Sequence, residues 1–224
     1  MKFKMFHSLL RKELLLLFRA QNGLISMVSL ILSFVYIFHF VFEKDFFLER
    51  NTIAGIRWSL IYLLSFIYIS QSSWEEREGG ADRIGSGMIS GTYIYLAKTL
   101  SSFSALTLSS LVLNFACIFL FEKSSMSFNE FIMQYALLFP GMLSVAAIGV
   151  CISRISEATR LKEIIIPVLQ IPLSLPPLLF GMNAERKMLA SGKIPMEGFF
   201  AVLSFSVFYL TLGTLAEEVL GGKD

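Results

Sequence analysis

The chain has 224 residues, of which 55% are hydrophobic and only 16% are charged, and its formal net charge at pH 7 is +2. Soluble domains carry about 25% charged residues, so this composition excludes an ordinary soluble domain and favours an integral membrane protein with several helices in one domain. The small net charge gives no indication of a nucleic-acid partner.

Residues 1–21 are predicted to form an amphipathic helix that lies in the membrane interface. Apolar residues recur there at helical spacing, and five Lys and Arg residues accompany a single acid, Glu13. A basic face suits anionic lipid headgroups, while the apolar face can enter the lipid. The alternative is a simple positively charged flank for the first span, but the sustained periodicity favours an interfacial helix.

Six apolar runs follow, and each is close to the ~20 residues that a helix needs to cross a bilayer. Together they predict an all-α, polytopic membrane domain over residues 22–220 with six transmembrane helices. The predicted spans are 22–42, 57–74, 99–121, 131–153, 164–182 and 198–216.

The distribution of Lys and Arg predicts the orientation of these spans. Of the 19 Lys and Arg residues, 12 fall on the side that holds both termini and seven on the other side. The richer side is expected to face the cytoplasm, so both termini and the loop 74–98 are predicted to be cytoplasmic. Cys117 and Cys151 then lie near opposite membrane faces, too far apart for a disulfide, and are expected to be free.

Two of the spans carry small residues that let helices approach closely. These faces are expected to pack within the chain, although packing on a second copy is the alternative. The residues are Ser101, Ala105 and Ser109 in the third span and Gly141, Ala146, Ala147 and Gly149 in the fourth.

The fifth span contains four of the six prolines, namely Pro167, Pro172, Pro176 and Pro177. Proline removes a backbone donor and kinks a helix, and the freed carbonyl groups need other partners. The run is a possible hinge, and the alternative is a static, irregular packing element.

The six apolar runs contain almost none of the charged residues that ion-coupled transport requires. Apart from Arg57, which is interpreted as a rim residue, the six runs contain no Asp, Glu, Lys or Arg, so ion-coupled transport is not expected. No catalytic set, resident cofactor or metal site is predicted.

Gly80 and Gly85 have the spacing of a phosphate-binding loop, but Ser86 replaces the required Lys. Any energy for transport would therefore come from a separate subunit.

The interval 74–98 is the longest polar stretch and is the predicted docking site for such a subunit. Mixed charges suit a reversible interface, and large apolar side chains can anchor it, although a charged stretch is often only a solvated surface. The candidate coupling residues are Trp74, Glu75, Glu76, Arg77, Glu78, Asp82, Arg83 and Met88.

Three segments carry a resemblance to a known family. Residues 53–58 (IAGIRW), 95–98 (YLAK) and 166–173 (IPVLQIPL) resemble the haem exporter protein B family, the permease subunit of cytochrome c maturation. The resemblance covers about residues 8–216 and implies the fold of an exporter-type (ABC-2) permease. The loop between spans two and three, here Trp74 to Met88, would dock on a cytoplasmic ABC ATPase subunit.

The resemblance also implies a role and a set of partners. The complex would act at the cytoplasmic (inner) membrane, with a second permease copy and a separate haem-handling membrane protein. It would either export haem or use ATP hydrolysis to release a haem-loaded chaperone, so haem is a possible substrate of the complex. The alternatives are an exporter permease for a lipid or drug and a non-transporting membrane scaffold.

Overall fold

Within its described residues, the computed structural model is built from α-helices, as the sequence predicts. The described residues are 2–19, 21–42, 50–78, 90–121, 126–156 and 162–221. The helices are α1 (Lys2–Arg19), α2 (Gln21–Phe42), α3 (Arg50–Glu78), α5 (Gly91–Leu120), α6 (Phe128–Ser156), α7 (Lys162–Ser191) and α8 (Met196–Gly221).

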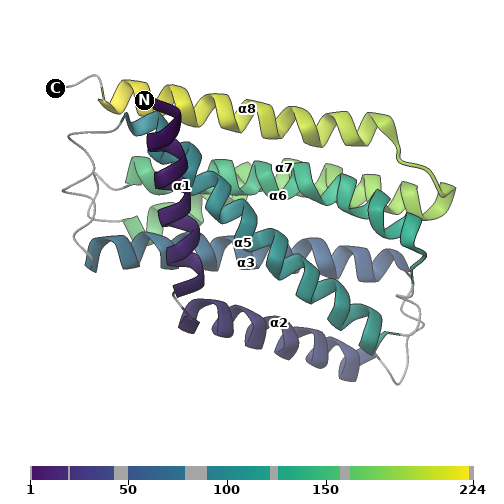
Figure 1. Cartoon of the computed structure of the whole chain (residues 1–224). Coiled ribbons are helices and arrows are strands. Elements are labelled where there is room, and N and C mark those ends of the chain that lie inside the picture. The colour runs from purple at the N-terminus through teal and green to yellow at the C-terminus, as the bar shows by residue number, and fades with distance from the viewer. Residues whose placement is uncertain are drawn as a thin grey trace.

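The helices α2, α3, α5, α6, α7 and α8 run back and forth between the two ends of one bundle (Figure 1). Both chain termini lie at the same end, which we call the terminus end. There α2, α5 and α7 begin, and α3, α6 and α8 finish. The opposite end is called the distal end. Consecutive membrane crossings require this alternation of direction. An even number of crossings then brings both termini to the same end.

Five of the helices, judged on the described residues, are long and apolar enough to cross a membrane. They contain the segments Ile25–Phe42, Arg50–Ile69, Gly91–Leu120, Phe128–Ser156 and Met196–Val219. The predicted fifth span, now α7, is not among them, although it packs against α3, α6 and α8. The chain is a multi-pass membrane protein, and the count of six spans stays a prediction.

Most helices extend well beyond the apolar runs that predicted them. α3 begins at Arg50 instead of residue 57, and α7 continues to Ser191 instead of ending at residue 182. A helix of 30 residues is about 45 Å long, whereas the hydrocarbon core is about 30 Å thick. Hydropathy therefore detects only the central part of such a helix.

Local signals fix two of the helix ends at the distal end. α6 starts with a capping box, in which the Glu130 backbone N–H donates to Ser127 Oγ and the Ser127 N–H donates to the Glu130 carboxylate. α7 is followed by Gly192, whose φ of 66° is a left-handed conformation that glycine adopts without steric cost.

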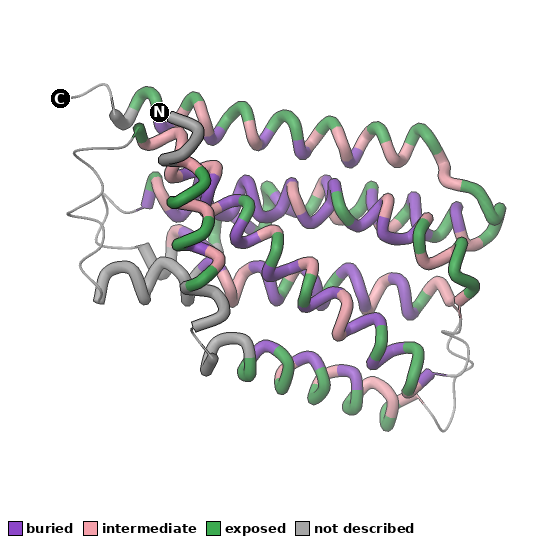
Figure 2. Tube along the Cα trace, in the orientation of Figure 1, coloured by how far each residue is buried: buried purple, intermediate pink, exposed green. Residues whose placement is uncertain are grey.

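The centre of the bundle is α6, and its small residues explain why. The membrane-crossing window of α6 is 83% buried, against 17% for α2, and Figure 2 shows the exposed outer face of α2. Ala146 and Ala147 are fully buried, while Gly141 and Gly149 contact side chains of α3. In α5, Ser109 Oγ lies 3.9 Å from Met27 Sδ of α2. Packing of these small-residue faces within the chain is therefore confirmed.

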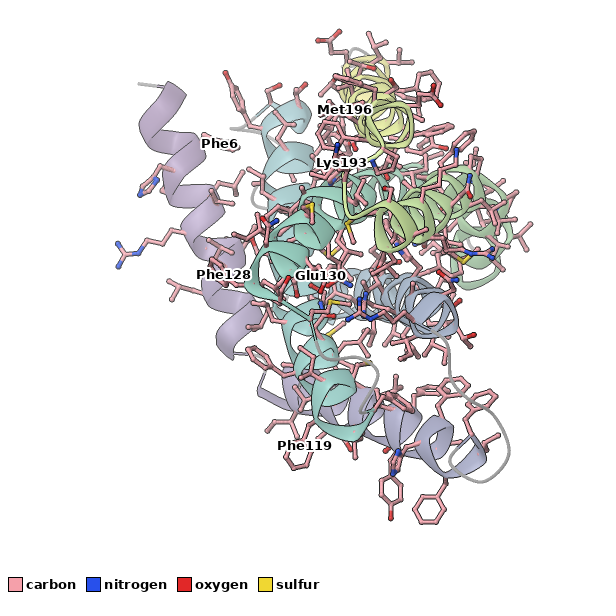
Figure 3. The ribbon with its side chains drawn as sticks, turned by 90° about the vertical axis from the view of Figure 1, so that its right-hand side faces the viewer. Phe6, Phe119, Phe128, Glu130, Lys193 and Met196 are labelled. Atoms are coloured by element: carbon pink, nitrogen blue, oxygen red, sulfur yellow. The ribbon has the colours of Figure 1, made fainter. Side chains whose placement is uncertain are left out.

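The first helix lies across the bundle instead of along it (Figures 1 and 3). Its Phe6 ring packs on Tyr93 of α5, and Ser101 of α5 donates to the backbone carbonyl of Glu13. Arg11 and Lys12 stay exposed. If the bundle axis follows the membrane normal, this geometry puts α1 parallel to the membrane plane, as expected for an interfacial helix.

Candidate coupling end and a buried charge cluster

The predicted coupling interval is not a loop throughout. Residues 74–78 are helical and form the C-terminal end of α3, and residues 91–98 form the beginning of α5. Trp74, Glu75, Glu76, Arg77 and Glu78 thus extend α3 at the terminus end. Three further predicted coupling residues, Asp82, Arg83 and Met88, lie outside the described residues.

The beginning of α5 is anchored firmly in the bundle. Tyr95 is fully buried, and its hydroxyl lies 3.2 Å from the carbonyl oxygen of Ala147 in α6 and 3.1 Å from that of Tyr209 in α8. Gly213 of α8 makes room for the ring, because a Cβ there would overlap Tyr95 Cζ. A displacement of the beginning of α5 would therefore be transmitted to α6 and α8 through the Tyr95 hydroxyl.

An ion pair closes the same end of the bundle. Arg154 of α6 donates from Nε to Glu217 Oε1 of α8 at 2.7 Å, and its Nη2 lies 3.4 Å from Oε2. Glu217 is nearly buried, and its carboxylate leaves no room for a Cβ on Gly91, the first residue of α5. Three helix ends thus meet at one bidentate ion pair.

A second charged cluster lies inside the bundle, toward the distal end. The carboxylate of Glu185 in α7 accepts hydrogen bonds from Arg57 Nη1 and, at 2.6 Å, from Trp58 Nε1, both of α3. It also accepts one at 2.9 Å from Gln134 Nε2 of α6. Arg57 and Glu185 are only 1% and 0% exposed. We call Arg57, Trp58, Gln134 and Glu185 the charge cluster.

The charge cluster corrects two predictions from the sequence. Arg57 is a buried residue and not a rim residue, because α3 begins two turns earlier than the apolar run. The bundle interior also holds an acidic residue, Glu185, because α7 continues past residue 182. One signal could have revealed this residue: the buried positions Gln170, Ser174, Pro177, Gly181 and Glu185 recur at helical spacing, so one face of α7 continues through the charged stretch.

The four prolines of the predicted hinge lie in α7, which is a continuous helix in the structure. Pro177 cannot donate to the carbonyl of Leu173, one helical turn earlier. Tyr209 of α8 donates its hydroxyl to that carbonyl at 2.5 Å. The structure thus gives this freed carbonyl the neighbouring donor that a proline in a membrane helix requires.

The described residues contain no group of His, Cys, Asp and Glu that could hold a metal ion. Cys117 and Cys151 are buried and free, as the sequence predicts. His39, near the distal end of α2, packs its ring against Phe121.

An all-α bundle of long apolar helices, with a transverse amphipathic helix at one end, defines a polytopic membrane protein. The family model described as CcmB protein matches residues 4–219, so the chain belongs to the CcmB family, the membrane components of the haem-exporter ABC system of cytochrome c maturation. The resemblance found in the sequence is thereby confirmed. No curated protein matches the chain.

Proposed function

We propose that this chain is the permease subunit of an ABC transporter complex for cytochrome c maturation in the cytoplasmic membrane. A separate ATPase subunit docks at the terminus end, which faces the cytoplasm. The complex exports haem or uses ATP hydrolysis to release a haem-loaded chaperone, and it includes a second permease copy and a haem-handling membrane protein. The family match over residues 4–219 carries this proposal.

The arrangement of α3 and α5 supports docking at the terminus end. α3 carries Trp74, Glu75 and Glu76 in its last turns, and α5 begins on the other side of the interval that joins them. The start of α5 is tied to α6 and α8 by Tyr95. A partner bound here would contact one long helix and, through α5, the core of the bundle.

The first prediction tests this docking by charge reversal. Glu75→Lys with Glu76→Lys is expected to weaken ATPase binding roughly tenfold, since two reversed rim charges cost on the order of 1–2 kcal/mol. The measurement is co-purification of the ATPase at matched membrane abundance of the permease.

The matched control reverses two acids between α2 and α3, which the sequence places on the opposite side. Glu43→Lys with Asp45→Lys is expected to retain the ATPase as well as the wild type does. If the Glu75 and Glu76 variant also retains it, these acids do not hold the partner. The terminus end around Arg154 would then be the next surface to test.

A further inference from the structure

The α3–α7 interface is fixed most firmly at the charge cluster. Glu185 accepts three hydrogen bonds there, two from α3 and one from α6. The Trp58 ring fills the space beside two glycines, because a Cβ on Gly141 or Gly181 would overlap it. Hydrogen bonds and close packing therefore hold α3, α6 and α7 together at this one level.

Toward the terminus end, the same interface contains buried polar groups without partners. Within the described part of the chain, no hydrogen-bond partner is found for Tyr62 Oη, Ser174 Oγ or either polar atom of the Gln170 amide. The register places them in line with the charge cluster, since Ile69 of α3 and Gln170 of α7 both lie against Gly149 of α6. Two atoms of the charge cluster, Arg57 Nε and Gln134 Oε1, also lack a partner among the described residues, but Glu185 still accepts three hydrogen bonds there, whereas the unpaired groups toward the terminus end make none. Unsatisfied buried polar groups weaken an interface, so this part of the contact opposes separation less than the charge cluster does.

α7 is also less constrained along this part of its length. Pro172, Pro176 and Pro177 remove three backbone donors within six residues, and a helix bends most easily where such bonds are missing. The carbonyl of Leu173, which Pro177 leaves without a helical donor, is bonded to Tyr209 of α8 and not to α3. The prolines and the unpaired polar groups thus lie on the same side of the charge cluster.

α3 connects this interface to the predicted docking surface. It is one uninterrupted helix from Arg50 to Glu78, so Arg57 lies about 30 Å from the end that bears Glu75 and Glu76. A displacement of that end by a partner would turn α3 about whichever contact holds it most firmly. That contact is the charge cluster.

We propose that Arg57 and Glu185 are positioning residues of the permease, and that their ion pair is the pivot about which α3 and α7 separate toward the terminus end when the ATPase acts. This inference rests on the proposed function. A buried ion pair can often be replaced by neutral side chains of similar volume at little cost in stability, so stability alone does not account for this pair. Charged groups within a membrane bundle instead tend to mark moving or functional parts.

The first experiment removes the ion pair and keeps the shape of the site. In the double variant Arg57→Met and Glu185→Gln, the amide still accepts from Trp58, so folding and ATPase co-purification are expected to match the wild type. Cytochrome c maturation is expected to fall at least tenfold. Arg57→Lys, which keeps the charge, is expected to retain most of the maturation that the double variant loses.

A second ion pair on the same helix supplies the control. Arg50 of α3 and Glu130 of α6 pair at 3.0 Å near the distal surface, where both are partly exposed. The variant Arg50→Met and Glu130→Gln is expected to mature cytochrome c normally. Normal maturation in the Arg57 and Glu185 double variant overturns the pivot. Failure of the wild-type chain to retain the ATPase instead overturns the proposed function.

The second experiment uses wild-type contacts and so does not depend on a variant of the charge cluster. Spin labels at Thr52 and Lys187 report the distal separation of α3 and α7, and labels at Ile67 and Val168 report the separation toward the terminus end. When the ATPase in the complex is trapped with nucleotide, the second distance is expected to change by several ångströms while the first stays constant. Equal changes at both levels, or no change at either, overturn the pivot.

Discussion

Trp58 illustrates how single glycines set the packing of this bundle. Its ring lies against Gly141 of α6 and Gly181 of α7, and its indole N–H donates to Glu185. A larger residue at either glycine would push the ring away and break that hydrogen bond. The position of one aromatic side chain thus depends on the absence of two Cβ atoms on neighbouring helices.

Adding a methyl group at these sites is expected to destabilise the protein. Gly141→Ala and Gly181→Ala should each cost about 1–3 kcal/mol, because the new Cβ overlaps the Trp58 ring. Gly55→Ala is the control, since its Cβ would meet only Met182 Sδ at an ordinary 3.7 Å. Thermal unfolding in detergent measures the effect. A midpoint for the Gly141 or Gly181 variant as high as that of the Gly55 variant would contradict the packing described here.

Individual residues were the hardest feature to predict from the sequence. The identity of Arg57 was evident, but its partner is 128 positions away in the chain, and no local pattern connects the two. Glu185 stands beside Arg186 and Lys187, and such a run of charges is typical of a solvated loop. Helical spacing can place Glu185 on the buried face of α7, but only the three-dimensional register of α3 against α7 shows that its partner is Arg57.

At the scale of the element, α7 combines helical continuity with prolines and a buried charge, both of which usually destabilise a helix inside a bundle. It is a continuous helix of 30 residues with four prolines, and it carries a buried carboxylate. Neighbouring helices supply what its own backbone lacks, as the Tyr209 hydroxyl does for the Leu173 carbonyl. The stability of α7 therefore depends on its contacts with α3, α6 and α8.

A double-mutant cycle can measure this dependence. Tyr209→Phe is expected to cost about 1–3 kcal/mol of unfolding free energy, because the Leu173 carbonyl loses its donor. Pro177→Ala restores a backbone N–H one turn after Leu173, so in that background Tyr209→Phe is expected to cost much less. The measurement is thermal stability of the four proteins in detergent. Equal costs in both backgrounds would show that the hydroxyl does not replace the missing backbone donor.

The elements themselves were largely predictable, because an apolar run of about 20 residues in a chain of this composition is typical of a membrane-spanning helix. Every predicted run coincides with a helix, although the third run extends one residue past the end of α5, and the periodicity of residues 1–21 predicts α1. The ends were less predictable, since helices continue into the headgroup region where hydropathy falls. For that reason the sequence predicts a loop at residues 74–78, although the structure assigns them to α3.

At the scale of the whole molecule, the two ends of the bundle differ in composition. The terminus end carries α1 with its exposed Arg11 and Lys12, and the ion pair of Arg154 with Glu217. The distal end, seen face-on in Figure 3, presents Glu130 and Lys193 together with the exposed apolar side chains of Phe119, Phe128 and Met196. The sequence assigns 12 Lys and Arg residues to the terminus side and seven to the other, or six without the buried Arg57, and this excess predicts a cytoplasmic terminus end.

The last prediction tests this orientation with single cysteines on the helices. Cys117 and Cys151 are buried and free, so replacing both with Ala gives a cysteine-free background. Asn129→Cys introduces a thiol at the exposed start of α6, and Glu218→Cys introduces one at the exposed end of α8. In intact cells, a membrane-impermeant maleimide is expected to label position 129 and not position 218, because the distal end faces outward. After the membrane is permeabilised, both positions are expected to react, which shows that each thiol is accessible. Labelling of position 218 alone in intact cells would invert the topology and would place the ATPase-docking surface at the distal end.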